Sequence, residues 1–156
     1  MSKLNIVTYN VNSIKSQDRI NSFLVEIKRL KADIIYVIDT RLNPSQNRYL
    51  KNNITGYKVF SNTVGDLASR GVTILIKSSL NLEVLDKDMD NDGNFLMLKV
   101  RYDNIDYILA AVYGPSEPAL EFYDEIYDKC FGLGCDNVLM GGDFNMTLDF
   151  EKDARG

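Results

Sequence analysis

Apolar positions follow two different spacings along the N-terminal part of the chain. Over Gln17–Leu30 they fall three or four residues apart, which predicts an amphipathic helix with Ser16 as its N-cap. Asp33–Ile38 is a continuous apolar run, which is typical of a strand buried on both faces. A shorter β-rich run precedes the helix at Leu4–Tyr9. These three segments together predict a β-α-β unit.

The rest of the chain carries shorter patterns of the same two kinds. They predict helices at Pro44–Asn53 and Leu120–Phe131, strands at Tyr57–Ser61, Gly71–Lys77, Asn81–Leu85, Phe95–Tyr102, Ile105–Val112 and Asn137–Met140, loops at Asn62–Arg70 and Asp86–Asn94, and a break at Pro115–Pro118. Two βα passages therefore flank an antiparallel middle. That order predicts a single α/β domain with a mixed sheet.

Neighbouring strands in the middle of the chain are expected to pair as hairpins. Asn81–Leu85 is expected to pair with Gly71–Lys77 across Ser78 and Ser79. Phe95–Tyr102 and Ile105–Val112 are expected to form a second hairpin across Asp103-Asn104.

Composition narrows the class of protein. Of 156 residues, 45% are hydrophobic, enough for a core. The longest apolar runs, such as Tyr107–Tyr113, fall far below the ~20 residues that span a bilayer. No secretory signal precedes the first strand, so an intracellular location is expected, nuclear or cytoplasmic, without a membrane partner. Cys130 and Cys135 are expected to be free thiols.

The charge pattern limits how nucleic acid would be bound. A net charge of −4 argues against a broad electrostatic grip on phosphates, but it is compatible with an acidic site offset by a divalent metal. The acidic run Asp86–Asp92 lacks the Glu that closes a calcium loop, which favours a solvated loop. Three basic residues near candidate site loops, Lys15, Arg41 and Arg70, have two explanations: contact with phosphate, or the more common scattered surface charge.

Polar residues cluster where four predicted strands end. The segments are Thr8–Asn12, Asp39-Thr40, Val112–Pro115 and Gly142–Asn145. Loops at strand ends commonly present catalytic groups. Asp39 and Asp143 supply hard oxygen ligands of the kind that Mg²⁺ prefers. On an extended backbone Asp143 and Asn145 would face the same side while Phe144 turns into the core.

In this order the four segments resemble the endonuclease/exonuclease/phosphatase superfamily of metal-dependent phosphodiesterases. Two stretches, residues 33–42 and 142–156, resemble most the apurinic-type endonuclease domain of non-LTR retrotransposons. The resemblance runs from Leu4 to Gly156. It implies the N-terminal portion of a four-layer α/β sandwich, with two packed mixed sheets flanked by helices, in a domain over residues 1–156 that is C-terminally incomplete.

The resemblance implies a role for each candidate residue near the metal. Asn10 would help to organise the metal and the catalytic carboxylates, and Asp39 would be the principal metal ligand. The implied cofactor is Mg²⁺, with Mn²⁺ as a substitute. Asn12 matches a position near the site and is a candidate for substrate binding.

The resemblance also assigns residues to the substrate phosphate. Tyr113 would contact the scissile phosphate, Asp143 would orient or deprotonate the attacking water, and Asn145 would bind a phosphate oxygen. The ordinary structural alternatives are a packed Tyr113, a turn or helix-cap Asp143, a strand-ending Asn10 and a solvated Asp39.

Two departures bear on activity. Asp39 stands where the family has Glu, so its carboxylate reaches ~1–1.5 Å less far. The chain contains no His, whereas the family ends in a Ser-Asp-His segment. The chain alone is therefore expected to be a poor catalyst or none, and to expose strand edges and apolar surface.

The sequence thus predicts a Mg²⁺-dependent DNA endonuclease of a retrotransposon-type element, with DNA as substrate and a reverse transcriptase domain on the same polypeptide. Two alternatives stay open. One is a phosphatase or phospholipid hydrolase of the same superfamily, and the other is a non-catalytic remnant or binding module.

Overall fold

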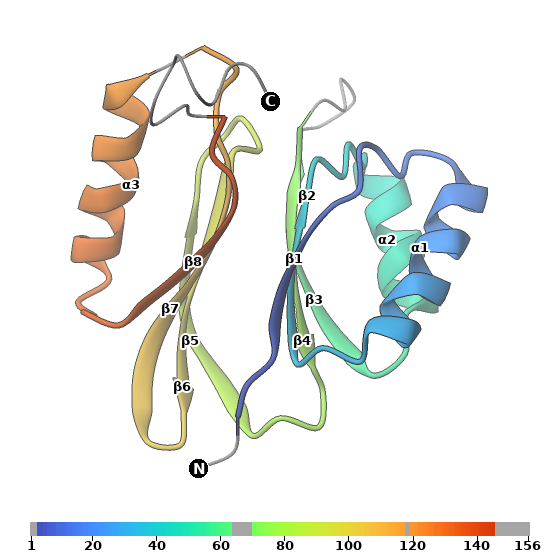
Figure 1. The fold of residues 1–156 in the computed structure, drawn as a ribbon, viewed down its shortest axis with the longest axis horizontal. Coiled ribbons are helices and arrows are strands. Elements are labelled where there is room, and N and C mark those ends of the chain that lie inside the picture. The colour runs from blue at the N-terminus through green and yellow to red at the C-terminus, as the bar shows by residue number, and fades with distance from the viewer. Residues whose placement is uncertain (1–2, 64–69, 118, 146–156) are drawn as a thin grey trace, which may run out of the picture.

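The structure is a computed structural model, and it describes residues 3–63, 70–117 and 119–145. Two four-stranded sheets pack face to face, and helices cover both outer faces (Figure 1). The elements are β1 (Ile6–Asn10), α1 (Gln17–Leu30), β2 (Ile34–Ile38), α2 (Pro44–Asn53), β3 (Tyr57–Asn62), β4 (Val72–Lys77), β5 (Leu82–Met89), β6 (Phe95–Tyr102), β7 (Ile105–Tyr113), α3 (Leu120–Gly132) and β8 (Val138–Asp143). The expected four-layer α/β sandwich is confirmed.

Both sheets are mixed. The first has the order β1-β2-β4-β3, and the second has the order β5-β6-β7-β8. Within them β1 pairs parallel with β2, β7 pairs parallel with β8, and every other pair is antiparallel. Each parallel pair needs a crossover, which α1 and α3 supply.

Local sequence explains the helices on the outer face of the first sheet. The Ser16 side chain accepts a hydrogen bond from the Arg19 N–H at 3.2 Å and starts α1, as predicted. A capping box between Asn43 and Gln46 starts α2, with Pro44 in its first turn. The apolar stripe of α1 faces the sheet, where Ile20 is fully buried.

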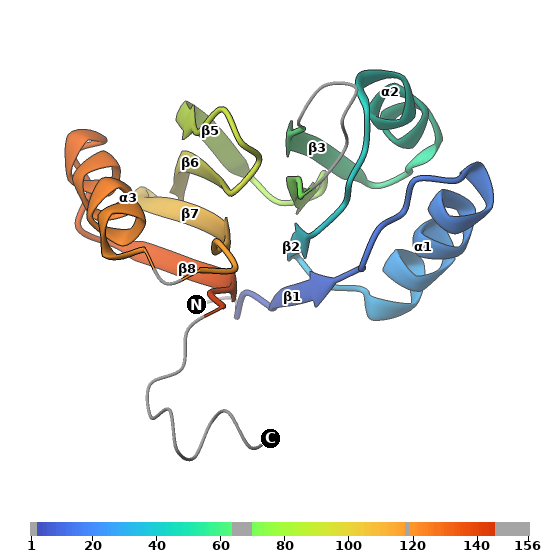
Figure 2. The same cartoon turned by 90° about the horizontal axis from the view of Figure 1, so that it is seen from above.

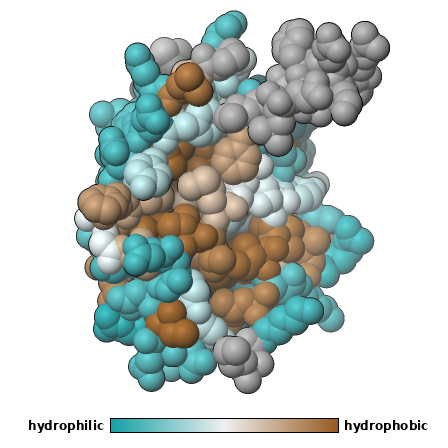
Figure 3. All heavy atoms as spheres, turned by 60° about the vertical axis from the view of Figure 1, so that its left-hand side comes forward, coloured by the Kyte–Doolittle hydropathy of each residue, from teal (hydrophilic) through white to brown (hydrophobic). Residues whose placement is uncertain are grey.

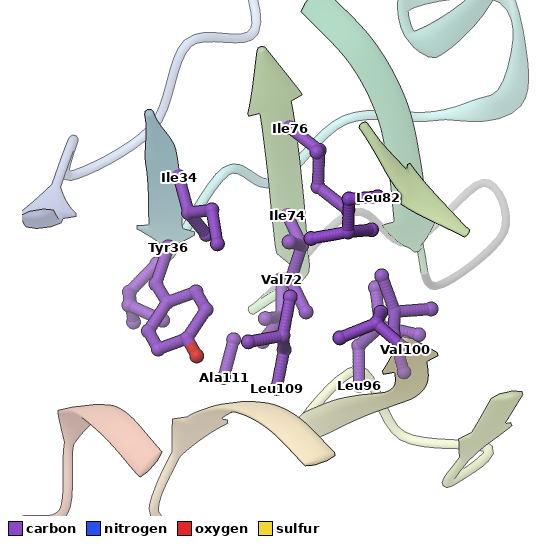
Figure 4. Packing of buried hydrophobic residues seen from close by; sticks show 12 residues of the cluster. Ile34, Tyr36, Val72, Ile74, Ile76, Leu82, Leu96, Val100, Leu109 and Ala111 are labelled. Atoms are coloured by element: carbon purple, nitrogen blue, oxygen red, sulfur yellow. The ribbon is translucent and has the colours of Figure 1, made fainter. Parts of the chain in front are cut away.

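The two sheets bury a continuous apolar layer between them (Figure 4). The first sheet contributes Ile34 and Tyr36, which pack opposite Leu96 and Leu109 of the second. The Tyr36 hydroxyl donates to the Leu139 carbonyl at 2.6 Å, which is a polar tie across this layer. The inward-facing residues of both sheets therefore set how the strand ends of one sheet meet those of the other.

Two expectations about the middle of the chain are wrong. β5 pairs with β6 rather than with β4, because Leu82 enters the layer between the sheets and carries the chain across. Asp86–Asn94 is not all loop, because Asp86 and Asp88 extend β5 beyond a bulge. An edge strand tolerates such charged residues. The turn begins only at Asp90, whose carboxylate accepts the N–H groups of the turn.

An apolar surface lies over α3 and β8. Tyr127 and Phe131 of α3 are 71% and 78% exposed, and Val138 and Met140 of β8 are partly exposed. Brown atoms gather on this side of the molecule in Figure 3. Within the described residues β8 pairs with β7 alone, so the expected open strand edge is present. No described helix is long and apolar enough to cross a membrane.

The tie between the sheets can be tested with Tyr36→Phe. Loss of the hydroxyl leaves the Leu139 carbonyl without this buried donor, so the free energy of unfolding should fall by about 1 kcal/mol. Urea denaturation measures the change. Tyr127→Phe, at an exposed hydroxyl, is the matched control and should have no effect. Equal stability of Tyr36→Phe and the wild type would show that the hydrogen bond contributes nothing to sheet packing.

Candidate active site

The carboxyl ends of β1 and β8 lie side by side where the two sheets meet (Figure 2). Parallel pairing places the ends of β2 and β7 at the same edge of the molecule. The Asn10 side-chain amide nitrogen lies 3.5 Å from Asp143 Oδ2, a long contact that joins the two sheets. Residues far apart in the sequence therefore gather at one edge of the molecule.

The segment after β8 is held by its own polar groups. The Asn145 N–H donates to Asp143 Oδ1 at 3.0 Å, and its side-chain amide donates to the Gly114 carbonyl at 2.7 Å. Asn145 has φ 49°, so the backbone here is left-handed rather than extended. The two side chains thus come together through a turn, which corrects the argument from strand alternation. Phe144 does pack inward, beside Tyr123.

Glycine is required where the strand ends crowd together. A Cβ on Gly114 would collide with the Phe144 carbonyl, and one on Gly142, at φ 143°, would collide with the Val112 carbonyl. These close approaches explain the glycines of the two segments that carry Tyr113 and Asp143.

Three of the predicted residues share one pocket. Asn10, Asp143 and Asn145 line a hollow of about 690 Å³, together with Thr8, Ile38, Ser116, Gly142 and Phe144. Asn12 does not join them. Its N–H donates to Asn10 Oδ1 at 3.0 Å, but Asn12 itself lines a separate hollow against α1.

Tyr113 ends β7 and is half-buried. Its N–H donates to the Asn94 carbonyl at 2.6 Å, and its own carbonyl accepts from the Asn94 side chain at 2.7 Å. Burial raises the pKa of its phenol, the Asp39 and Asp143 carboxylates raise it further, and two guanidiniums, Arg41 and Arg70, oppose them. The hydroxyl therefore stays protonated at neutral pH and is a hydrogen-bond donor.

Asp39 directly follows β2 and is only 4% exposed. The Arg41 guanidinium holds both of its carboxylate oxygens, with Nε 2.8 Å from Oδ1 and Nη2 3.1 Å from Oδ2. Hydrogen bonding to Asp39, followed by its charge, raises the pKa of Arg41. This ion pair was not part of the sequence prediction, because it depends on left-handed backbone at both Asp39 and Arg41.

A magnesium ion does not fit at Asp39 in this arrangement. Mg²⁺ takes oxygen ligands, usually one or two carboxylates with waters. Both oxygens of Asp39 already accept hydrogen bonds from Arg41. Among the described residues, no three acidic, Cys or His side chains gather around a common point.

Sequence reasoning missed Asn94 and gave no special weight to Arg70. Asn94 is 4% exposed, and its side chain joins Tyr113 to Arg70, whose Nη1 donates to Asn94 Oδ1 at 3.2 Å. A lone Asn at the end of an acidic run gives no sequence signal of such burial. The predicted motif residues 146–156 lie outside the described part of the chain, as does Pro118.

No family model matches the sequence. Solved structures with a similar fold include a humanised TDP2 of D. rerio (TM-score 0.72, 19% identity, covering 98% of this chain and 66% of that one). A D. rerio TDP2 complexed with single-strand DNA product matches with TM-score 0.72 and 20% identity, over 97% of this chain and 64% of that one.

A third similar structure is a mannosyl-6-phosphatase of Bacteroides thetaiotaomicron (TM-score 0.68, 12% identity, 92% of this chain and 66% of that one). An endonuclease/exonuclease/phosphatase family protein of the same organism has TM-score 0.68 and 12% identity. The chain therefore has the endonuclease/exonuclease/phosphatase fold. It spans 64–66% of the length of these four structures.

The supporting role of Asn94 can be tested with Asn94→Ala. The substitution leaves the Tyr113 carbonyl without its side-chain donor, so the free energy of unfolding should fall by about 1–3 kcal/mol in urea denaturation. Asn137→Ala is the control, since it removes a similar amide-to-carbonyl bond, to Asp106, at an exposed site. A loss no larger than that of the control would mean that Asn94 does not support the site.

Proposed function

We propose that this chain is the N-terminal part of a phosphodiester hydrolase that nicks DNA. The observation that carries the proposal is the convergence of Asn10, Asp143 and Asn145 in one pocket at the strand ends. The fold and the resemblance of the four segments support it. The DNA-bound state of one similar TDP2 structure also favours a nucleic-acid substrate.

In this proposal Asp143 is the general base. Asn10 and the Asn145 N–H contact its two oxygens, so the carboxylate is held in one orientation. It would accept a proton from a water that attacks phosphorus. A positioned base of this kind contributes by proton transfer in the transition state.

Tyr113 and Asn145 would bind the phosphate oxygens. The protonated Tyr113 hydroxyl is a donor, and the Asn145 amide has a second N–H besides the one that Gly114 uses. Donors placed before the reaction begins stabilise the charge that develops on phosphoryl oxygens.

Magnesium, with manganese as a substitute, is the cofactor that the resemblance implies, and a bound ion would neutralise phosphate charge. No step is assigned to it, because Arg41 holds the Asp39 carboxylate. The retrotransposon setting, with a reverse transcriptase domain on the same polypeptide, rests on the resemblance of residues 33–42 and 142–156 and is likewise proposed.

Two other functions have a specific observation in their favour. The mannosyl-6-phosphatase of similar fold favours hydrolysis of a phosphomonoester. The ion pair between Asp39 and Arg41 favours a binding module without catalysis, since Arg41 occupies the carboxylate that was predicted to bind the metal.

A plasmid-nicking assay tests the proposed function. The polypeptide that carries this sequence is incubated with supercoiled DNA and Mg²⁺, and Asp143→Ala and Asn145→Ala should each slow nicking by about a hundredfold or more. Asp136→Ala, at an exposed carboxylate outside the pocket, is the control. Nicking at the wild-type rate by either site variant would refute its role. Hydrolysis of sugar phosphates but not DNA would favour the phosphatase.

Metal binding can be tested through thermal stability. A ligand present at a hundredfold excess over its Kd stabilises the native state by about 2.7 kcal/mol, which is a rise of several degrees in Tm. Because Arg41 holds Asp39, we expect no such rise with millimolar Mg²⁺ or Mn²⁺. A clear rise would mean that the ion displaces the guanidinium, and it would count against the binding module.

A further inference from the structure

Two arginines from different segments, one following β2 and one preceding β4, are held together through their backbones. The Arg41 N–H donates to the Arg70 carbonyl at 2.6 Å, and the neighbouring Thr40 N–H donates to the Gly71 carbonyl at 3.2 Å. Both arginines have left-handed backbone, with φ 53° and 66°. Non-glycine residues rarely adopt this conformation, and where they do it frequently marks a functional segment.

The pair carries one positive charge more than its partners neutralise. The Asp39 carboxylate neutralises the positive charge of Arg41. Arg70 donates to Asn94 Oδ1, which is a neutral acceptor, and among the described residues no carboxylate lies within ion-pair distance of Arg70. Its side chain is exposed. An exposed guanidinium without a carboxylate partner is a place for an anion.

Tyr113 links this pair to the pocket. The Asn94 side-chain nitrogen donates to the Tyr113 carbonyl, and the Asn94 side-chain oxygen accepts from Arg70. One buried side chain therefore holds both residues. The charges of Arg41 and Arg70 both act on the Tyr113 phenol, as does the charge of Asp143. Tyr113 is also the register partner of Asp143 in the pairing of β7 with β8, so it borders the pocket that Asp143 lines.

We propose that Arg41 and Arg70 bind one phosphodiester group of a DNA strand without any metal, next to the scissile phosphate that Tyr113 contacts. Within the described part of the chain, Arg41 keeps the N–H groups of Nη1 beside those that hold Asp39, and Arg70 keeps those of Nε and Nη2 beside the one that holds Asn94. Such N–H groups match phosphate oxygens, and one diester carries the single negative charge that the pair lacks. The proposal rests on the proposed function, because it assigns this group to the strand whose scissile phosphate enters the Asp143 pocket. The positive charge next to the Asp39 carboxylate comes from Arg41 in this chain, rather than from a metal ion.

The test is binding of a fluorescently labelled hexathymidylate, followed by anisotropy in buffer with EDTA. The wild type should bind, and Arg70→Gln should weaken binding about tenfold. The slope of log affinity against log salt should also fall by about 0.7, the value for one phosphate contact on a single strand. Inorganic phosphate should compete.

The chain offers a matched control in Arg101→Gln. Arg101 makes the same two-pronged ion pair with Asp106, at 2.8 and 3.3 Å. It lies at the far end of β6, roughly 20 Å along the strand from the site. Its loss should change neither the affinity nor the salt slope. An equal loss in this variant would show that only net charge matters, and it would overturn the proposal.

Arg41 needs a double variant, because its loss alone would leave the buried Asp39 carboxylate unpaired. Asp39→Asn with Arg41→Gln removes both charges, and its affinity should also fall about tenfold. Unchanged binding in this variant and in Arg70→Gln would overturn the proposal, as would wild-type binding that disappears in EDTA. Nicking plays no part in this readout. Metal-free binding with the expected losses but without nicking would therefore refute only the proposed function.

Discussion

The packing of the two sheets is the constraint on which the rest of the structure depends. A continuous apolar layer, tied by the Tyr36 hydroxyl to the Leu139 carbonyl, fixes the angle and register at which the sheets meet. Because β1 and β2 run parallel, as do β7 and β8, this one packing brings four strand ends to a common edge. Each of those ends carries a polar segment. The candidate site therefore follows from the core, since neither sheet alone presents both Asn10 and Asp143.

The loops near this edge are held by hydrogen bonds between polar groups rather than by apolar contacts. Asp90 satisfies the N–H groups of the turn before β6, and Asn94 in turn holds Tyr113 and Arg70. A buried polar network is stabilising only when its members find partners. Here the partners come from both sheets, so the network holds the turn before β6 against the end of β7 and the segment before β4.

The sequence predicted the regular elements well and the loops poorly. The helices at Gln17–Leu30 and Pro44–Asn53 have the predicted bounds, because periodicity and capping residues are local signals. The pairing of β5 was wrong, since a short turn favours a hairpin and nothing local reveals that Leu82 enters the layer between the sheets. The left-handed backbone at Asn145 and the burial of Asn94 are set by distant neighbours. For the same reason the candidate residues could be named while the Arg41 ion pair could not.

That ion pair changes the electrostatics of the edge. Asp39 is shorter than the Glu it resembles, and left-handed backbone at Asp39 and Arg41 brings their side chains together two residues apart. The Asp39 carboxylate was expected to bind a metal cation from solvent, but it is already paired with the Arg41 guanidinium. Positive charge is then concentrated on the first sheet, at Arg41 and Arg70, while the candidate base Asp143 ends a strand of the second. In the proposed function the two arginines and the base Asp143 therefore lie on different sheets, whereas Tyr113 and Asn145 share the second sheet with the base. The packing between the sheets couples the arginines to the base, so a change in the apolar layer would disturb both together, whereas a change at either edge would disturb one.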